Sequence, residues 1–142
     1  MSDANKTKHL ELIQGVVNRL STNSFLLKGW SVVLVSALFA LSAPNADASF
    51  IFLAYIPAFI FWGLDGYFLS QERLFRDLYN HVRKLDEGAI DFSMETTPFR
   101  SGEGFWDSFH DWQAVVASKT LIPFHGVLIG AIVVVMALHI IN

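Results

Sequence analysis

Apolar residues gather into three long windows along the chain, with shorter amphipathic segments between them. The windows are Phe25–Ala43, Ser49–Leu69 and Leu121–Ile141. Each holds about 19 to 21 residues, enough at a rise of about 1.5 Å per residue to cross a hydrocarbon core of roughly 30 Å. Transmembrane β-strands would be about half as long and would alternate polar and apolar positions. The pattern therefore predicts an all-α membrane protein with three spanning helices.

The second window continues without a break into a charged segment that keeps an apolar stripe. Apolar side chains recur there at spacings of three and four, the period of an amphipathic helix. They are Leu74, Phe75, Leu78, Tyr79, Val82 and Leu85. We therefore expect the second spanning helix, residues 49–69, to continue into the cytoplasm to about residue 87. Pro57 lacks a backbone donor and predicts a kink within the span.

Two more elements are expected outside the membrane. Residues 1–24 predict a cytoplasmic amphipathic helix, with one stripe formed by Leu10, Ile13, Val17 and Leu20. The stripe lacks the aromatic residues and basic flank of a helix that lies on lipid, so packing against the 70–85 helix is favoured. Residues 88–120 predict an irregular loop and then a short helix. This helix is marked by the apolar residues Phe105, Trp106, Phe109, Trp112 and Val116, which give it a strongly aromatic face.

The basic residues predict the orientation. Four of the ten Lys and Arg precede or open the first span, and the other six lie between the second and third spans. By the positive-inside rule the N-terminus and the 70–120 segment are cytoplasmic, and the C-terminus lies on the far side. The short 44–48 link makes the first two spans an antiparallel hairpin. Three spans cannot enclose a pore and the stripes need more burial than one short chain offers, so we expect a homo-oligomer.

Asp65 is the sharpest single candidate, because it lies at the inner end of the second span. An ionisable residue costs about 2.5 to 3.5 kcal/mol at the centre of a spanning helix and less near an interface. One interpretation is a carboxylate that lines or gates a pore; the other is an interface residue bonded to Ser70 or Lys28. Gly63 and Gly66 would permit a bend or a close neighbour. The candidate pore or gate residues are Asp65, Pro57, Gly63 and Gly66.

Basic and aromatic side chains also gather on the cytoplasmic continuation of the second span. In an oligomer they would form a ring able to hold phosphates and stack bases. The alternative is the ordinary basic flank of a span, with Arg–Asp and Arg–Glu pairs along the helix. The 70–120 segment favours this alternative, since it has nine acidic residues against six basic ones. The candidate ligand-binding residues are Arg19, Lys28, Arg73, Arg76, Tyr79, His81, Arg83 and Lys84.

The sequence shows no catalytic or metal-binding motif. It has no cysteine, and His125 and His139 stand fourteen residues apart, about 21 Å along one helix, so they cannot share a metal ion. A P-loop, a Gly-x-Ser-x-Gly turn, a paired-histidine zinc motif and a Rossmann fingerprint are all missing. Asp107 and Asp111 beside His110 are better explained as solvated acids than as a hydrolytic pair. We expect neither an enzyme nor a cofactor.

Two stretches of the chain resemble a known family. They are LELIQGVVNRLSTNSFLLKGW (Leu10–Trp30) and FWGLDGYFLSQERLFRDLYNHVR (Phe61–Arg83). They resemble small three-span membrane proteins of bacterial anti-phage defence loci, in particular the membrane effector of the Hailong system, which works beside a nucleotidyltransferase. The resemblance covers roughly the first two thirds of the chain and supplies no residue-level motif.

That family implies an oligomeric, tetrameric α-helical channel in the bacterial inner membrane. Short single-stranded DNA made by the partner nucleotidyltransferase would hold the pore closed, and phage activity would open it by removing the DNA. The leading hypothesis is therefore a gated pore whose opening leaks the inner membrane and arrests growth. The alternative is a membrane scaffold or accessory subunit that conducts nothing and recruits a cytoplasmic partner. A lipid-modifying enzyme that uses Asp107 or His110 is the least favoured hypothesis.

Overall fold

The structure, a computed structural model, describes residues 4–42, 49–102 and 104–141. The helices are α1 (Ala4–Leu41), α2 (Ser49–Leu53), α3 (Tyr55–Val82), α4 (Phe105–Val116) and α5 (Ile122–Ile141), with 3-10 turns at Glu87–Ala89 and Thr97–Phe99. No strand occurs within the described ranges. Three stretches are long and apolar enough to cross a membrane: Ala4–Leu41, Ser49–Val82 and Ile122–Ile141. The predicted all-α class with three candidate spans is confirmed.

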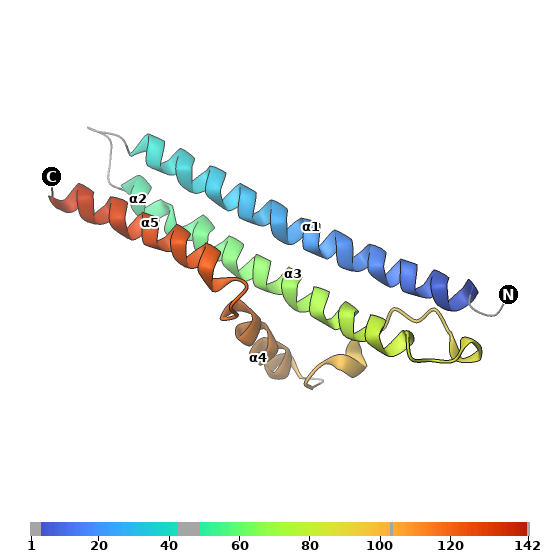
Figure 1. Cartoon of the computed structure of the whole chain (residues 1–142). Coiled ribbons are helices and arrows are strands. Elements are labelled where there is room, and N and C mark those ends of the chain that lie inside the picture. The colour runs from blue at the N-terminus through green and yellow to red at the C-terminus, as the bar shows by residue number, and fades with distance from the viewer. Residues whose placement is uncertain (1–3, 43–48, 103, 142) are drawn as a thin grey trace.

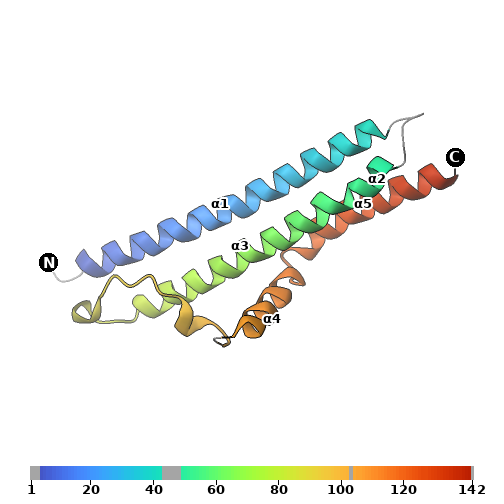
Figure 2. The same ribbon diagram turned by 180° about the vertical axis from the view of Figure 1, so that it is seen from behind.

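The helices lie nearly along one axis, in two halves of different character. α1 extends along most of the molecule, α3 runs antiparallel beside it, and α5 lies alongside α2 and the beginning of α3 (Figures 1 and 2). α4 diverges from that axis below α3. We call residues 25–42, 49–69 and 121–141 the apolar half, and residues 4–24, 70–102 and 104–120 the polar half. The link 44–48, predicted to join the hairpin, lies outside the described residues.

The first helix is longer than the sequence suggested. A cytoplasmic helix (1–24) and a separate span (25–43) were expected, whereas α1 is one continuous helix from Ala4 to Leu41. A boundary between two helices was suggested by a polar collar before the first span, formed by Asn18, Arg19, Ser21, Thr22, Asn23 and Ser24. The collar does not interrupt α1, because its hydroxyls bond without breaking the helix. Ser21 and Ser24 donate to carboxylates on α3, and Thr22 donates to the backbone of its own helix.

The second helix is interrupted where Pro57 predicts it. Ala54 alone separates α2 from α3, because the ring of Pro57 disturbs the turn that precedes it. α3 then ends at Val82, before the expected end near residue 87. The chain tightens there: the backbone N of Lys84 bonds to the carbonyl of His81 at 3.0 Å, an i to i+3 bond that winds the last turn into a 3-10 form.

Each half has its own apolar cluster. The cluster of the apolar half consists of Val35, Ile51, Ala54, Ala58 and Ile132, so it joins α1, α2, α3 and α5. The cluster of the polar half consists of Ile13, Val17, Leu78 and Val82, with Ile90, Met94 and Phe99 packed over it from the loop. The second cluster confirms that the N-terminal stripe packs against the 70–85 helix.

Candidate functional site

The carboxylate of Asp65 is fully buried where α1, α3 and α5 meet. Its Oδ2 lies 2.5 Å from Nζ of Lys28 and 2.9 Å from Nε2 of His125, and its Oδ1 accepts a hydrogen bond from the hydroxyl of Ser24. A carboxylate only accepts, so Nε2 of His125 donates the hydrogen bond to Asp65. We call Ser24, Lys28, Asp65 and His125 the Asp65 cluster, in which the carboxylate of Asp65 pairs with the ammonium group of Lys28 and accepts hydrogen bonds from Ser24 and His125.

Helical spacing brings these four side chains together. Ser24 and Lys28 are four residues apart on one face of α1, and Nζ of Lys28 donates to the hydroxyl of Ser24 at 2.9 Å. His125 faces inward on the same side of α5 as the buried Ile132, two turns further along. The cluster thus lies at the junction of the two halves and connects all three candidate spans.

Two tryptophans join the Asp65 cluster to α4. The ring of Trp62 stacks on His125, with centroids 5.7 Å apart and planes 10° apart, and its Nε1 donates to the carbonyl of Val116 at 3.1 Å. Trp112 of α4 donates from Nε1 to the carbonyl of Gly63 at 3.0 Å. α4 is therefore bonded to α3 within one turn of Asp65.

Gly63 and Gly66 are the surface on which α4 packs. A Cβ built at Gly66 would overlap the side chain of Val116, and one built at Gly63 would lie 3.4 Å from the ring of Trp112. The sequence allowed Gly63 and Gly66 either to bend the helix or to admit a close neighbour. In the structure they admit a close neighbour, α4.

The other bond proposed for Asp65, to Ser70, is not made, because Ser70 donates to the carbonyl of Tyr67 instead. The bond to Lys28 is present. The carboxylate is enclosed by three helices of the chain and has no exposed surface.

The candidate ligand-binding residues do not lie together. Lys28 belongs to the Asp65 cluster, while Arg76 pairs at 2.7 Å with the buried Glu72 on its own helix, as the basic-flank alternative predicted. His81 packs against Phe99, with ring centroids 5.7 Å apart. Tyr79 lies at the groove between α3 and α1. Arg19, Arg83 and Lys84 are exposed.

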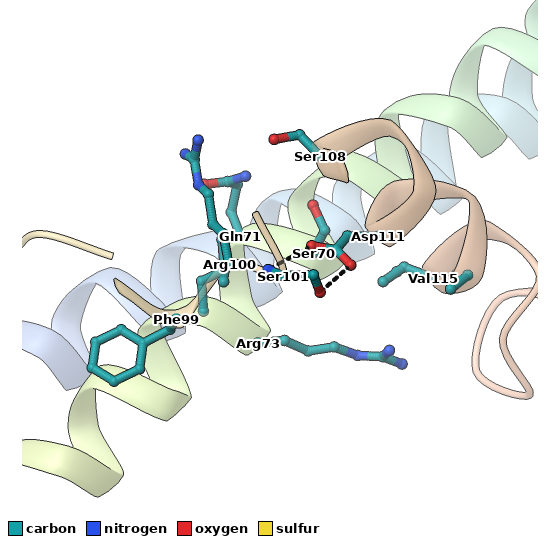
Figure 3. Close-up of a pocket in the computed structure, with 11 residues that line it drawn as sticks. Ser70, Gln71, Arg73, Phe99, Arg100, Ser101, Ser108, Asp111 and Val115 are labelled. Carbon is teal, nitrogen blue, oxygen red and sulfur yellow. Dashed lines mark hydrogen bonds between the residues drawn. The ribbon is translucent and has the colours of Figure 1, made fainter. Parts of the chain in front are cut away.

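Arg73 lines a hollow of about 270 Å³ between α3, residues 99–101 and α4 (Figure 3). We call it the α3–α4 hollow. Its polar lining consists of Ser70, Gln71, Arg73, Arg100, Ser101, Ser108 and Asp111. Asp111 accepts bonds from the hydroxyl of Ser101 at 2.6 Å and from its backbone N at 3.2 Å. Arg73 and Arg100 extend in different directions in Figure 3, so they do not form a clamp on one phosphate.

Sequence reasoning missed several residues of these sites. His125 was not identified as the partner of Asp65, and Glu72, which accepts from Ser21 at 2.8 Å, was only counted among the nine acidic residues of the 70–120 segment. Arg100 was not singled out at all. The sequence signal for the Asp65 cluster was the presence of ionisable residues in otherwise apolar windows, among them Lys28, Asp65 and His125.

No protein-family model, curated protein or solved structure matches the chain. The resemblance to the Hailong effector thus stays a prediction from the sequence. No group of three or more His, Asp or Glu side chains in the described ranges is placed to hold a metal ion.

Proposed function

We propose that the protein is an oligomeric pore of the bacterial inner membrane, gated by a nucleotide or by short single-stranded DNA. The Asp65 cluster is the observation that carries this proposal. Ionisable residues at the depth of a span are rare, and they mark ion pathways, proton relays and gating elements. Here an acid, a lysine and a histidine from three helices meet with no exposed carboxylate surface.

The pore itself would form between protomers. The three candidate spans of one chain pack against one another, and their outward face is apolar: Phe25 is 75% exposed and Val127 74% exposed. A ring of protomers, with a tetramer favoured, would enclose the lumen. The polar half would face the cytoplasm, where a partner nucleotidyltransferase would make the ligand. In this proposal the protein is not an enzyme, and its opening leaks the membrane and arrests growth.

The polar half supports a ligand of negative charge. Arg73 and Arg100 line the α3–α4 hollow, and Arg19, Arg83 and Lys84 are exposed elsewhere in the polar half. Because these side chains are dispersed, an extended anion that spans several of them fits better than a single phosphate group. A short oligonucleotide has this shape and charge.

Ion flux from liposomes that contain the purified oligomer tests the proposal. We expect flux that a short single-stranded DNA oligonucleotide suppresses, and we expect Asp65→Asn to alter the flux because it removes the anion of the cluster. Asp77→Asn is the matched control, since Asp77 is an exposed acid on the same helix. A well-folded oligomer that passes no ions, with or without oligonucleotide, would overturn the pore.

A non-conducting scaffold is the second candidate function. The observation that favours it is the complete pairing of Asp65 inside one protomer, which suits a fastener between helices as well as a gate. A scaffold would recruit a cytoplasmic partner through the polar half. It predicts no flux from any variant and a stable complex with the partner nucleotidyltransferase.

A further inference from the structure

The geometry points to α4 as the element that couples the α3–α4 hollow to the Asp65 cluster. This inference rests on the proposed function and adds its regulation: what happens at the hollow in the polar half would be felt by the ion cluster between the spans. α4 contributes a wall of the hollow on one face and packs beside the cluster on another, so one short helix touches both places.

The face of α4 toward the hollow is held by a bond that an anion would disturb. Asp111 accepts two hydrogen bonds from Ser101, and these join α4 to the segment that carries Arg100. An anionic ligand beside Arg73 or Arg100 would repel the carboxylate of Asp111 and compete for the donors of Ser101. An anion in the hollow would therefore weaken the hydrogen bonds from Ser101 to Asp111 that hold α4.

The other face of α4 is bonded to the helix that carries Asp65. Trp112 donates to the carbonyl of Gly63, and the carbonyl of Val116 accepts from Trp62. Gly66 leaves no room between the helices, because a Cβ there would overlap Val116. Packing this close tolerates no gradual sliding, so α4 is either docked on α3 or displaced from it.

Trp62 completes the connection. Its ring lies against the ring of His125, which donates to Asp65, and its Nε1 holds the C-terminal end of α4. Displacement of α4 would free the indole of Trp62 and remove the ring that orients His125. The Asp65 cluster would then lose the support of α5, and the contact of α1 with α3 and α5 would loosen.

A buried cysteine reports on this loosening without any ion flux. The chain has no cysteine, so Ser31→Cys introduces a single thiol. Ser31 is fully buried one turn beyond Lys28, and its hydroxyl bonds to the Lys28 carbonyl of its own helix, which makes the substitution mild. A charged, water-soluble thiol reagent should react slowly in the docked state. Asn80→Cys, an exposed position on α3, serves as the reference thiol.

Gly66→Ala and Trp112→Phe displace α4 in two different ways. The first adds a methyl group against Val116, and the second removes the indole donor to Gly63 while it keeps an aromatic ring. In the parent protein we expect the oligonucleotide to change the labelling rate of Ser31→Cys. Both substitutions should raise that rate severalfold and abolish its response to the oligonucleotide. Gly130→Ala is the matched control, because a Cβ at Gly130 has no atom within 4 Å among the described residues. It should label like the parent.

The outcomes separate this inference from the proposed function. Equal labelling in all variants, each folded by circular dichroism and assembled by size exclusion, would overturn the coupling. So would flux that still responds normally to the oligonucleotide in Gly66→Ala and Trp112→Phe, and in that case the pore would stand. Raised labelling in a protein that never conducts would support the coupling and overturn the pore. If Gly66→Ala does not fold, Trp112→Phe decides the matter alone.

Discussion

Each half of the molecule buries an apolar cluster, but the apolar half also encloses a group of polar and charged side chains and exposes large apolar ones, although the same two helices pass through both. In the polar half α1 and α3 bury Ile13 and Leu78. In the apolar half the fully buried residues include Ser31, Asp65 and His125, while Phe25 lies 75% exposed. The hydrophobic effect drives helix pairing in water, but lipid tails are as apolar as leucine, so packing and polar contacts must hold helices together there.

Removal of the cation from the Asp65 cluster should give the largest effect on this contrast. Lys28→Met leaves the carboxylate of Asp65 buried without its counter-ion, which we expect to lower stability by about 3 to 5 kcal/mol. Unfolding in detergent micelles measures the change. The double variant Lys28→Met/Asp65→Leu replaces both charges by apolar groups and should recover much of the loss. Purely additive losses would show that the two charges do not stabilise each other.

Truncation of the core in the polar half should come next. Ile13→Ala removes a side chain with no exposed surface from the cluster that joins α1 to α3, at an expected loss of about 2 to 4 kcal/mol. The same micelle unfolding assay measures it. Leu12→Ala is the neighbouring control, since Leu12 is 47% exposed and should change stability little. Equal losses at the two positions would mean that the stripe does not pack as described.

The matching truncation in the apolar half should cost less. Ile132 is also fully buried, so Ile132→Ala removes the same atoms from the cluster around Val35 and Ile51. Lipid solvates an exposed methyl group well, so only packing is lost, and we expect a loss about half that of Ile13→Ala. The comparison requires both variants in the same micelle. A loss at Ile132 as large as that at Ile13 would contradict the expectation that burial of an apolar side chain stabilises the apolar half less than the polar half.

The smallest expected effect concerns the border between the halves. Ser21 donates to the nearly buried carboxylate of Glu72 at 2.8 Å, so Ser21→Ala should cost about 1 kcal/mol. Thr22→Ala is its control, because the hydroxyl of Thr22 is exposed and bonds only within α1. A stability change at Thr22 equal to that at Ser21 would assign the effect to helix propensity rather than to the bond between helices.

The sequence predicted what local patterns determine. Window length predicted the three candidate spans, and the spacing of Ile13 and Val17 predicted which face of the first helix is buried. Asp65 was singled out because a charge in an apolar window is expensive. These features depend on residues within a turn or two of one another, so a single sequence was sufficient to predict them.

Contacts between distant segments could not be predicted in the same way. His125 is sixty residues from Asp65, and Trp112 is forty-nine residues from Gly63. The continuity of α1 was missed for the same reason: the polar collar suggested a boundary, whereas its serines are satisfied by carboxylates on another helix. The basic residues looked like one patch in sequence, but Lys28 and Arg76 already have carboxylate partners.

Because α1 is one unbroken helix, a displacement of one of its ends also displaces the other end. Its 38 residues extend about 57 Å at a rise of about 1.5 Å per residue, from the N-terminal tip of the polar half to the C-terminal end of the first candidate span. With no loop between its two halves, α1 has no point at which one half could tilt independently of the other. A tilt of about 5° about one end would move the other end by about 5 Å, a full turn of helix. A partner that pushes on the first few turns would therefore shift the opposite end of the first candidate span.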